Sequence, residues 1–281
     1  MAEGDWTDAE NDVVVSAYLA LLESELRGQS MVKAEVNREV QRATGRGRGS
    51  VEFKFQNVSA VMRELRMPWV RGYKPAVNFQ SSLSDAVLRQ VPAQTSLLES
   101  AIESMDRVFE AQPTTIEWNA VAAPVVEFSK FADRHRKAVR VDFVKMDAEN
   151  RSLGLAGEIA VVERERSLLR LAGKDDLARQ VEHVSQTQGD GLGFDIRSFD
   201  LGGRERYLEV KSTRRGADWP MMVAPNEVRF SADEPAKFEL HRVFDLTPSR
   251  AGLYVLRGAI EQTCDLRPAS YEALPAQLAV S

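Results

Sequence analysis

Two acidic residues and a lysine in the last third of the chain have types and spacing that suit phosphodiester chemistry. Asp195 lies in the segment 193–196, and Glu209 and Lys211 lie in the segment 208–213. Because side chains alternate along a strand, Glu209 and Lys211 share one face. If the strand of Asp195 lies alongside, its carboxylate approaches that of Glu209. Two carboxylates so close are stable together mainly when a divalent cation lies between them.

Mg²⁺ suits such a pair, because it binds through one or two carboxylates and keeps water ligands for a phosphate. We expect Mn²⁺ to substitute for it. A bound cation would polarise the phosphoryl oxygen, and Lys211 would orient the attacking water or stabilise the added charge. The alternative is an ordinary solvated ion pair, which is what an acid-x-Lys pair on a strand usually is.

The elements around these residues predict a mixed α/β sheet domain. Asn150 can cap a helix that ends near Leu171. A hairpin-like pair of strands and a short helix from Pro225 follow. The strand candidates are residues 193–199, 206–213, 221–224, 238–244 and 252–260.

The first third of the chain predicts an all-helical domain. Thr7 and Glu10 form a capping-box pattern for a helix that reaches Leu26, and Ser30 and Ser50 are candidate caps of the next two helices. The predicted division is a helical DNA-contacting domain (1–92), a helical connector (93–147), the α/β domain (148–265) and a C-terminal tail (266–281).

The net charge of −5 hides a segregation of charge. Residues 1–26 carry seven acidic residues and no Lys or Arg, whereas residues 27–74 carry eleven basic residues against four acidic ones. Within the basic block, a glycine-rich loop bears Arg46 and Arg48, and Lys54 follows. These three side chains are candidates for DNA contact. The alternative is an interhelical loop whose arginines are merely solvated.

Four other side chains have two interpretations each. Ser212 and Thr213 either hydrogen-bond a DNA phosphate or only end the strand. Trp69 and Tyr73 either stack on an unpaired base or pack beside the nearby prolines.

The amino-acid composition excludes several classes of protein. With 43% hydrophobic and 28% charged residues, the chain has the balance of a globular protein. The single cysteine, Cys264, excludes an internal disulfide and a cysteine-built zinc site. The acidic N-terminus is not a signal peptide, and no apolar run suits a membrane span. We therefore expect a cytoplasmic location.

Asp195, thirteen intervening residues and then Glu209-x-Lys211 resemble the core of PD-(D/E)XK nucleases. The wider set, residues 153–158, 189–196, 208–213 and 225–227, looks like the branch named after the C-terminal domain of the plant protein NO VEIN. The resemblance covers about residues 148–265 and implies a restriction-endonuclease-like fold. It also implies that Glu158 completes the metal site. Phe194 replaces the proline of the motif's name.

A second, weaker resemblance covers about residues 6–90. Its motifs are residues 50–54, 57–61 and 72–75, with Asn78 and Gln80. They look like a helical module found ahead of restriction-type nuclease domains in bacteria, which implies a DNA-reading or docking part.

The sequence therefore predicts a bacterial, metal-dependent DNA endonuclease that restricts foreign DNA, with modified DNA among the candidate substrates. No membrane or nucleotide cofactor is expected. A homodimer follows only from the need to cut both strands. One alternative is an inactive nuclease fold that binds DNA or regulates a partner. Another is an interaction protein whose helical half recruits a larger complex.

Overall fold

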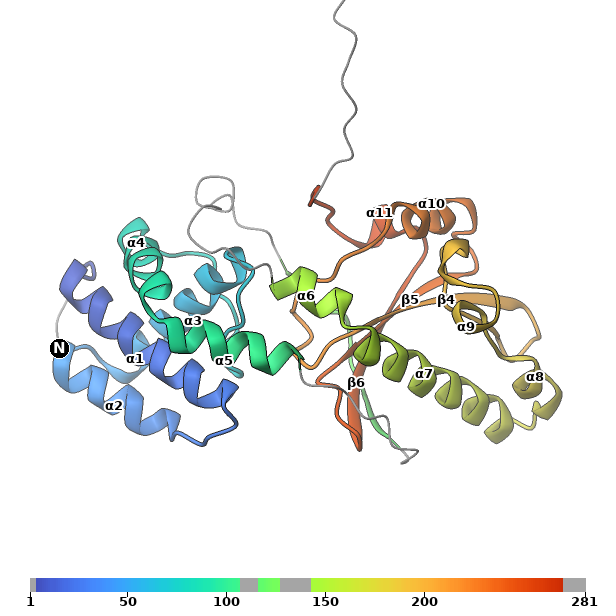
Figure 1. Cartoon of the computed structure of the whole chain (residues 1–281), viewed down its shortest axis with the longest axis horizontal. Helices are drawn as coiled ribbons and strands as arrows, with labels where there is room; N and C mark the ends of the chain where they lie inside the picture. The colour runs from blue at the N-terminus through green and yellow to red at the C-terminus, as the bar shows by residue number, and fades with distance from the viewer. Residues whose placement is uncertain (1–3, 107–115, 127–142, 270–281) are drawn as a thin grey trace, which may run out of the picture.

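The computed structural model describes residues 4–106, 116–126 and 143–269. These residues form two lobes, a helical one that begins the chain and a sheet-containing one that follows it (Figure 1). The predicted order of an all-helical part before a mixed α/β part is confirmed.

The helical lobe consists of five α-helices and a short 3-10 helix in the described residues. They are α1 (Asp8–Leu26), α2 (Lys33–Thr44), α3 (Arg48–Glu64), α4 (Ser81–Gln90), η1 (Val91–Ala93) and α5 (Thr95–Asp106). Their apolar sides share one core, in which Leu22, Phe55 and Met62 are fully buried. That core, rather than helix propensity, gives short helices most of their stability.

The ends of these helices follow the sequence only in part. The capping box is confirmed, because Glu10 N donates to Thr7 Oγ1 over 3.3 Å and Thr7 N donates to Glu10 Oε2 over 2.7 Å. Ser30 and Ser50 were wrong as caps. Helix α2 begins after Val32, and α3 begins after Gly47, so that Ser50 lies inside its first turn.

The sheet lobe contains six strands and the remaining helices of the described part. The strands are β1 (Glu117–Ala120), β2 (Glu182–His183), β3 (Ile196–Phe199), β4 (Glu205–Ser212), β5 (Phe238–Phe244) and β6 (Arg250–Arg257). The helices after α5 are α6 (Phe143–Glu149), α7 (Arg151–Leu171), α8 (Asp175–Gln180), α9 (Val184–Thr187), η2 (Asp190–Leu192), α10 (Pro225–Asp233) and α11 (Ile260–Thr263). Of these, α6 buries Phe143 and Val144 in the core of the helical lobe.

The sheet has the order β1-β6-β5-β4-β3-β2. Strands β3 and β4 form an antiparallel hairpin, and β5 runs parallel to β4 after the crossover through α10. Strand β6 returns antiparallel to β5, and β1 adds a parallel edge. The sheet is therefore mixed, as the sequence predicts.

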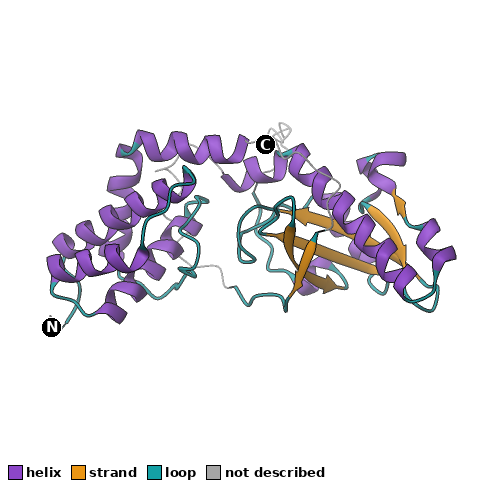
Figure 2. Ribbon diagram, turned by 90° about the horizontal axis from the view of Figure 1, so that it is seen from below, coloured by secondary structure: helices purple, strands orange, loops and turns teal. Residues whose placement is uncertain are grey.

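Helix α7 covers one face of the sheet, and α10 and α11 cover the other (Figure 1). Asn150 caps α7 as predicted, since its side chain accepts a hydrogen bond from Leu153 N. The long helix lies across the strands in Figure 2. It packs on a core that includes Leu208 and Val243, whereas Phe238 and Ile260 belong to the core of the opposite face.

Two predicted elements need correction. Strand β1 lies inside the segment 93–147, which the sequence predicted to be a helical connector; residues 107–115 and 127–142 of that segment lie outside the described residues. Residues 221–224 do not form a strand. Met221 and Val223 are apolar because they cover the core around Phe238, and this burial produced a strand-like pattern.

The two lobes meet through aromatic packing. Trp219, which follows β4 in the chain, belongs to the helical lobe's core, and its ring centroid lies 4.9 Å from that of Trp69. Tyr73 is also buried in this core. Packing is therefore the confirmed interpretation of Trp69 and Tyr73, and base stacking is wrong. Among the described helices, none is long and apolar enough to cross a membrane.

Candidate functional site

The β3–β4 hairpin brings Asp195 to β4. Ile196 pairs with Leu208, so Asp195 lies directly before its strand, and the antiparallel register places it opposite Glu209. Asp195 N donates to Leu208 O over 2.9 Å, and Asp195 Oδ2 accepts from Val210 N over 2.8 Å. These bonds fix the carboxylate beside β4.

Glu209 and Lys211 lie on one face of β4, as strand alternation predicts. Lys211 Nζ lies 2.7 Å from Glu209 Oε1 and 2.8 Å from Glu227 Oε2, a carboxylate on the first turn of α10. Glu227 Oε2 also accepts from Ala224 N over 2.9 Å, so the helix start holds it in place. The lysine is thus bound between two carboxylates.

Glu158 approaches from α7. Its Oε2 accepts hydrogen bonds from His183 Nε2, at 2.7 Å, and from Ser185 Oγ, at 2.6 Å. The helix can come this near to β4 because residue 157 is glycine: a Cβ there would lie 1.7 Å from Ser212 Oγ. The position of Gly157 therefore explains how a helical glutamate reaches the end of the hairpin.

The four carboxylates Glu158, Asp195, Glu209 and Glu227 are called the acidic cluster below. Burial raises the pKa of Asp195 to about 7, and the charges of Glu158 and Glu227 add to this effect. Burial also raises the pKa of Glu209; Lys211 opposes the rise, while Asp195 and Glu227 increase it. These directions mean that burial first, and the neighbouring carboxylates second, disfavour the ionised forms of Asp195 and Glu209.

Two side chains of the site, Glu158 and Lys211, have partners that stabilise their charged forms. Burial disfavours ionised Glu158, yet the hydrogen bonds from His183 and Ser185 lower its pKa below the ordinary value. Burial likewise disfavours the charged form of Lys211, but Glu209 and Glu227 raise its pKa. Lys211 therefore stays an ammonium, and Glu158 stays a carboxylate, at neutral pH.

The donor chemistry of the acidic cluster fits Mg²⁺, which prefers carboxylate oxygens. A cation between Asp195 and Glu209 would stabilise their ionised forms, which burial disfavours. Within the described residues, however, no group of three or more His, Cys, Asp and Glu side chains is arranged to hold a metal ion. The reason is visible in the contacts, because Glu209 is turned to Lys211 and Glu158 is turned to His183.

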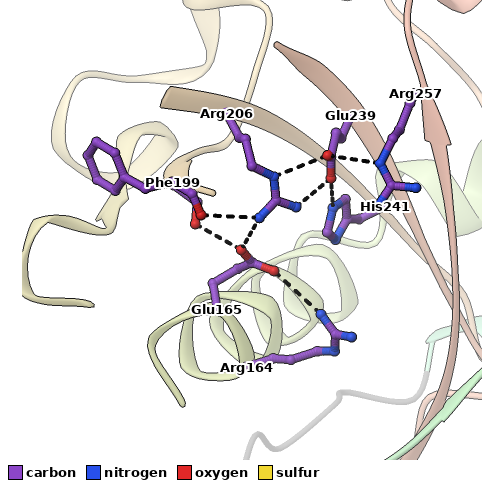
Figure 3. Close-up of polar contacts among 8 residues, drawn as sticks. Arg164, Glu165, Phe199, Arg206, Glu239, His241 and Arg257 are labelled. Atoms are coloured by element: carbon purple, nitrogen blue, oxygen red, sulfur yellow. Dashed lines mark hydrogen bonds and ion pairs between the residues drawn. The ribbon is translucent and has the colours of Figure 1, made fainter. Parts of the chain in front are cut away.

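On the face of the sheet that α7 covers, a buried ion-pair network ties the helix to three strands (Figure 3). Arg206 is its centre, with Nη1 2.8 Å from Glu165 Oε2 and Nε 3.1 Å from Glu239 Oε1. Glu239 also binds His241 Nε2 at 3.0 Å and Arg257 Nε at 3.1 Å. Because strand side chains alternate, this network lies across the sheet from Glu209 and Lys211, and it serves as scaffold.

Several residues expected to contact DNA have other partners. Arg46 is buried; its Nε lies 2.7 Å from Glu10 Oε1, and its two terminal nitrogens donate to the carbonyls of Gly4 and Asp5. The expected phosphate contact of Arg46 is therefore corrected to a structural role. Lys54 is also buried, with Nζ 2.9 Å from Gln80 Oε1. Arg48 is exposed, and its contact with DNA stays a prediction.

The two hydroxyls after Lys211 also point to packing rather than to a phosphate. Ser212 Oγ is buried against Gly157 of α7. Thr213 is fully buried, and its Oγ1 accepts a hydrogen bond from Arg215 N over 3.1 Å. The alternative that they merely close the end of the strand is the one that these contacts favour.

Sequence reasoning missed three polar residues of the site. Glu227 was part of the family-like segments but received no role of its own. His183 was interpreted as a structural or surface residue and Ser185 received no role, since no local pattern links either of them to Glu158. Among the predicted residues, the structure brings Glu158, Asp195, Glu209 and Lys211 to one place.

Residues 157–256 match the sequence model of the family described as Protein NO VEIN, C-terminal. The match includes all of the acidic cluster and Lys211. No curated protein and no solved structure matches the chain. The chain thus contains a NO VEIN C-terminal domain, preceded by an all-helical N-terminal region.

Proposed function

Because residues 157–256 form a NO VEIN C-terminal domain, we propose that the chain is a metal-dependent DNA endonuclease. One observation carries the proposal: the half-buried carboxylate of Asp195 and the buried carboxylate of Glu209, both with raised pKa values, lie beside the charged Lys211. Buried titratable groups with strongly shifted pKa values occur most often at functional sites. A role in restricting foreign DNA belongs to the same proposal.

In this proposal Asp195 and Glu209 hold Mg²⁺, and Glu158 assists them. The ion would polarise the phosphoryl oxygen and favour ionisation of the attacking water. The chain's own groups do the positioning. The main-chain N–H of Val210 orients the Asp195 carboxylate, and His183 and Ser185 orient Glu158.

Lys211 supplies a positive charge at the site. Its ammonium has three N–H donors, of which Glu209 and Glu227 take two. The third can donate to the attacking water or to a phosphate oxygen, where charge accumulates in the transition state. Glu227 acts as a positioning residue, since it holds Lys211 from the side of α10.

Cleavage of a DNA panel tests the proposal. The panel contains plasmid, linear duplex, single strand and cytosine-modified phage DNA, each with Mg²⁺, Mn²⁺ or EDTA. Cutting that needs the metal, and that Asp195→Ala abolishes, is the expected result. If the folded wild type cuts none of these DNAs with either metal, the proposal that this chain alone is an endonuclease fails.

A second candidate is a nuclease fold that binds DNA or a partner without cutting. The contact that favours it is the closed arrangement of Lys211 between Glu209 and Glu227, which already neutralises part of the acidic cluster. Calorimetric titration with Mg²⁺ and Mn²⁺ separates the two functions. Metal binding that is lost in Asp195→Ala, with DNA affinity retained, supports the enzyme. A wild type that binds DNA and no metal supports the second candidate.

A further inference from the structure

A pocket of about 350 Å³ lies in the helical lobe, away from the acidic cluster. Three of its walls are the aromatic side chains of Trp6, Phe53 and Phe79. Polar groups of Lys54 and Gln80 also line it. The volume is near the lower end of ligand pockets, which run from roughly 300 to 1,000 Å³, and suits one planar ring system.

The residues that line this pocket include several from the motifs of the helical module, which have no role in the proposed cleavage reaction. The start of α3 carries Phe53 and Lys54, and the loop before α4 carries Asn78 and Gln80. Asn57 joins the two segments, because its Nδ2 donates to Ala76 O over 2.8 Å and to Asn78 O over 3.2 Å. The helix and the loop therefore hold the pocket walls at a fixed distance.

Lys54 is the unusual group of this pocket. Its side chain is only 4% exposed, and burial lowers its pKa to about 8. Its Nζ donates to Gln80 Oε1 and lies 5.0 Å from the centroid of the Trp6 ring. An ammonium has three donors, and among the described residues only Gln80 offers an acceptor within hydrogen-bond distance. A buried donor with spare capacity is costly unless something accepts from it.

Phe53, unlike the buried Lys54, is exposed to solvent. It is 50% exposed although it lies beside the buried lysine, so a large aromatic face remains open at the pocket. A ring that stacks on Phe53 would place its polar edge toward the lysine side of the pocket. Aromatic stacking combined with hydrogen bonds to a base edge is how proteins read a base that has left the helix.

We propose that this pocket binds one unpaired nucleobase of the DNA. The base stacks on Phe53, its carbonyl or ring-nitrogen acceptor receives a hydrogen bond from Lys54, and the side-chain amides of Asn78 and Gln80 face its edge. This inference rests on the proposed function, because it makes the helical lobe the part that reads DNA for the nuclease domain.

The charges around the pocket favour a base over a phosphate. The neighbouring Arg46 is already bound by Glu10, so Lys54 is the cation that the pocket itself offers. Phosphate recognition uses several charged donors, often a bidentate arginine, whereas a neutral aromatic ring needs one donor and a stacking surface. The aromatic and amide side chains that line this pocket therefore suit a neutral aromatic ring better than a phosphate.

Binding of three short duplexes to the full chain tests the inference, with Ca²⁺ in place of Mg²⁺. One duplex carries a single extra nucleotide, the second carries an abasic residue at that place, and the third is fully paired. The expected result is tighter binding of the first duplex than of the abasic one. Base–aromatic stacking predicts a preference of roughly five- to 150-fold.

Two variants assign that preference to the pocket. Phe53→Ala removes an exposed ring and leaves the core intact, and Lys54→Met removes the donor but keeps the length of the side chain. Phe53→Ala should bind the base-containing and abasic duplexes equally, and Lys54→Met, which keeps the stacking ring, should lose part of the preference. The control is Val32→Ala, at an exposed apolar residue of the same lobe that does not line the pocket, and it should keep the wild-type preference.

Equal binding of the base-containing and abasic duplexes by the wild type would overturn the inference, whether or not the protein cuts DNA. A preference that survives in Phe53→Ala would overturn it too. A preference that depends on Phe53, in a protein that cuts no DNA, supports the pocket and contradicts the endonuclease. The two proposals can thus fail separately.

Discussion

Gly157 of α7 lies against Ser212 of β4 so closely that a Cβ on residue 157 would stand 1.7 Å from the serine oxygen. No L side chain fits at that distance without movement of the helix or the strand. Because Glu158 is the next residue, the contact also sets how deeply this carboxylate reaches toward Asp195. Gly157 therefore helps to position Glu158 in the site, because it allows α7 to pack closely against β4.

Gly157→Ala should push α7 away from β4. We expect it to lower the free energy of unfolding by about 1–3 kcal/mol, as overpacking of a core usually does. Cleavage should also fall, since Glu158 moves with the helix. The measurements are urea unfolding and the rate of DNA cutting.

Gly154→Ala is the matched control, in the same helix one turn earlier. A Cβ at residue 154 would meet only Glu158 Oε1, at 3.9 Å. This variant should be neutral or more stable by up to about 1 kcal/mol, since alanine suits a helix better than glycine. Equal effects of the two substitutions would contradict the packing argument.

The network around Arg206 predicts a large effect on stability. Arg206→Ala leaves two buried carboxylates, Glu165 and Glu239, without their main partner. Breaking a buried ion pair on one side costs about 3–5 kcal/mol. Arg204→Ala removes an exposed pair with Asp200 and should cost about 0–1 kcal/mol. Similar denaturation midpoints for the two variants would show that the network does not hold α7 to the sheet.

Arg46 and Glu10 predict a pH-dependent contribution to stability. The hydrogen bonds from Arg46 lower the pKa of Glu10 from 4.5 to about 2. A carboxyl whose pKa falls on folding stabilises the protein above its unfolded pKa, and the contribution is lost as the pH falls toward 2. Glu10→Gln should therefore cost about 1.5–3 kcal/mol at pH 7 and progressively less below pH 4.5.

The measurement is the difference in unfolding free energy between wild type and Glu10→Gln across this pH range. Glu35→Gln, at an exposed residue whose carboxylate lies 3.9 Å from Arg38, serves as control and should give a small difference at every pH. A difference for Glu10→Gln that does not change with pH would contradict the ion pair as its source.

His183 should act through Glu158. His183→Ala removes a hydrogen bond to the carboxylate, and loss of such an orienting partner usually weakens metal binding by about 10- to 100-fold. His183→Gln keeps a donor at a similar reach and should recover part of the affinity. Calorimetric titration with Mn²⁺ is the measurement. Unchanged affinity in His183→Ala would exclude Glu158 as a metal ligand.

The sequence was informative where the structure depends on local spacing. Strand alternation placed Glu209 and Lys211 on one face, and the capping patterns at Thr7 and Asn150 marked two helix starts correctly. The sequence did not predict which charged side chains are buried, because their burial depends on partners that are distant in the chain. The positive charge of Arg46 suggested DNA, yet Glu10, far away in the chain, had already paired with it.

The missing parts of the site have the same cause. Glu158 meets His183 and Ser185 only after α7, β2 and α9 have packed together, and no local pattern records that contact. Strand β1 was missed because a four-residue edge strand leaves too short an alternation to detect. Residues 221–224 were wrongly predicted to form a strand, because the sequence pattern of an apolar loop that covers a core resembles that of a strand.

The rate of DNA cutting by Lys211→Ala beside wild type tests the central claim most directly. Measured with saturating enzyme and Mg²⁺ or Mn²⁺, the rate should fall by about 100- to 1,000-fold, as it does when one charge-stabilising donor is removed from an active site. Lys237→Ala, at a lysine that pairs with Glu234 outside the acidic cluster, should cut at the wild-type rate. If Lys211→Ala cuts as fast as wild type, or if wild type does not cut, the acidic cluster is not the active site of a nuclease.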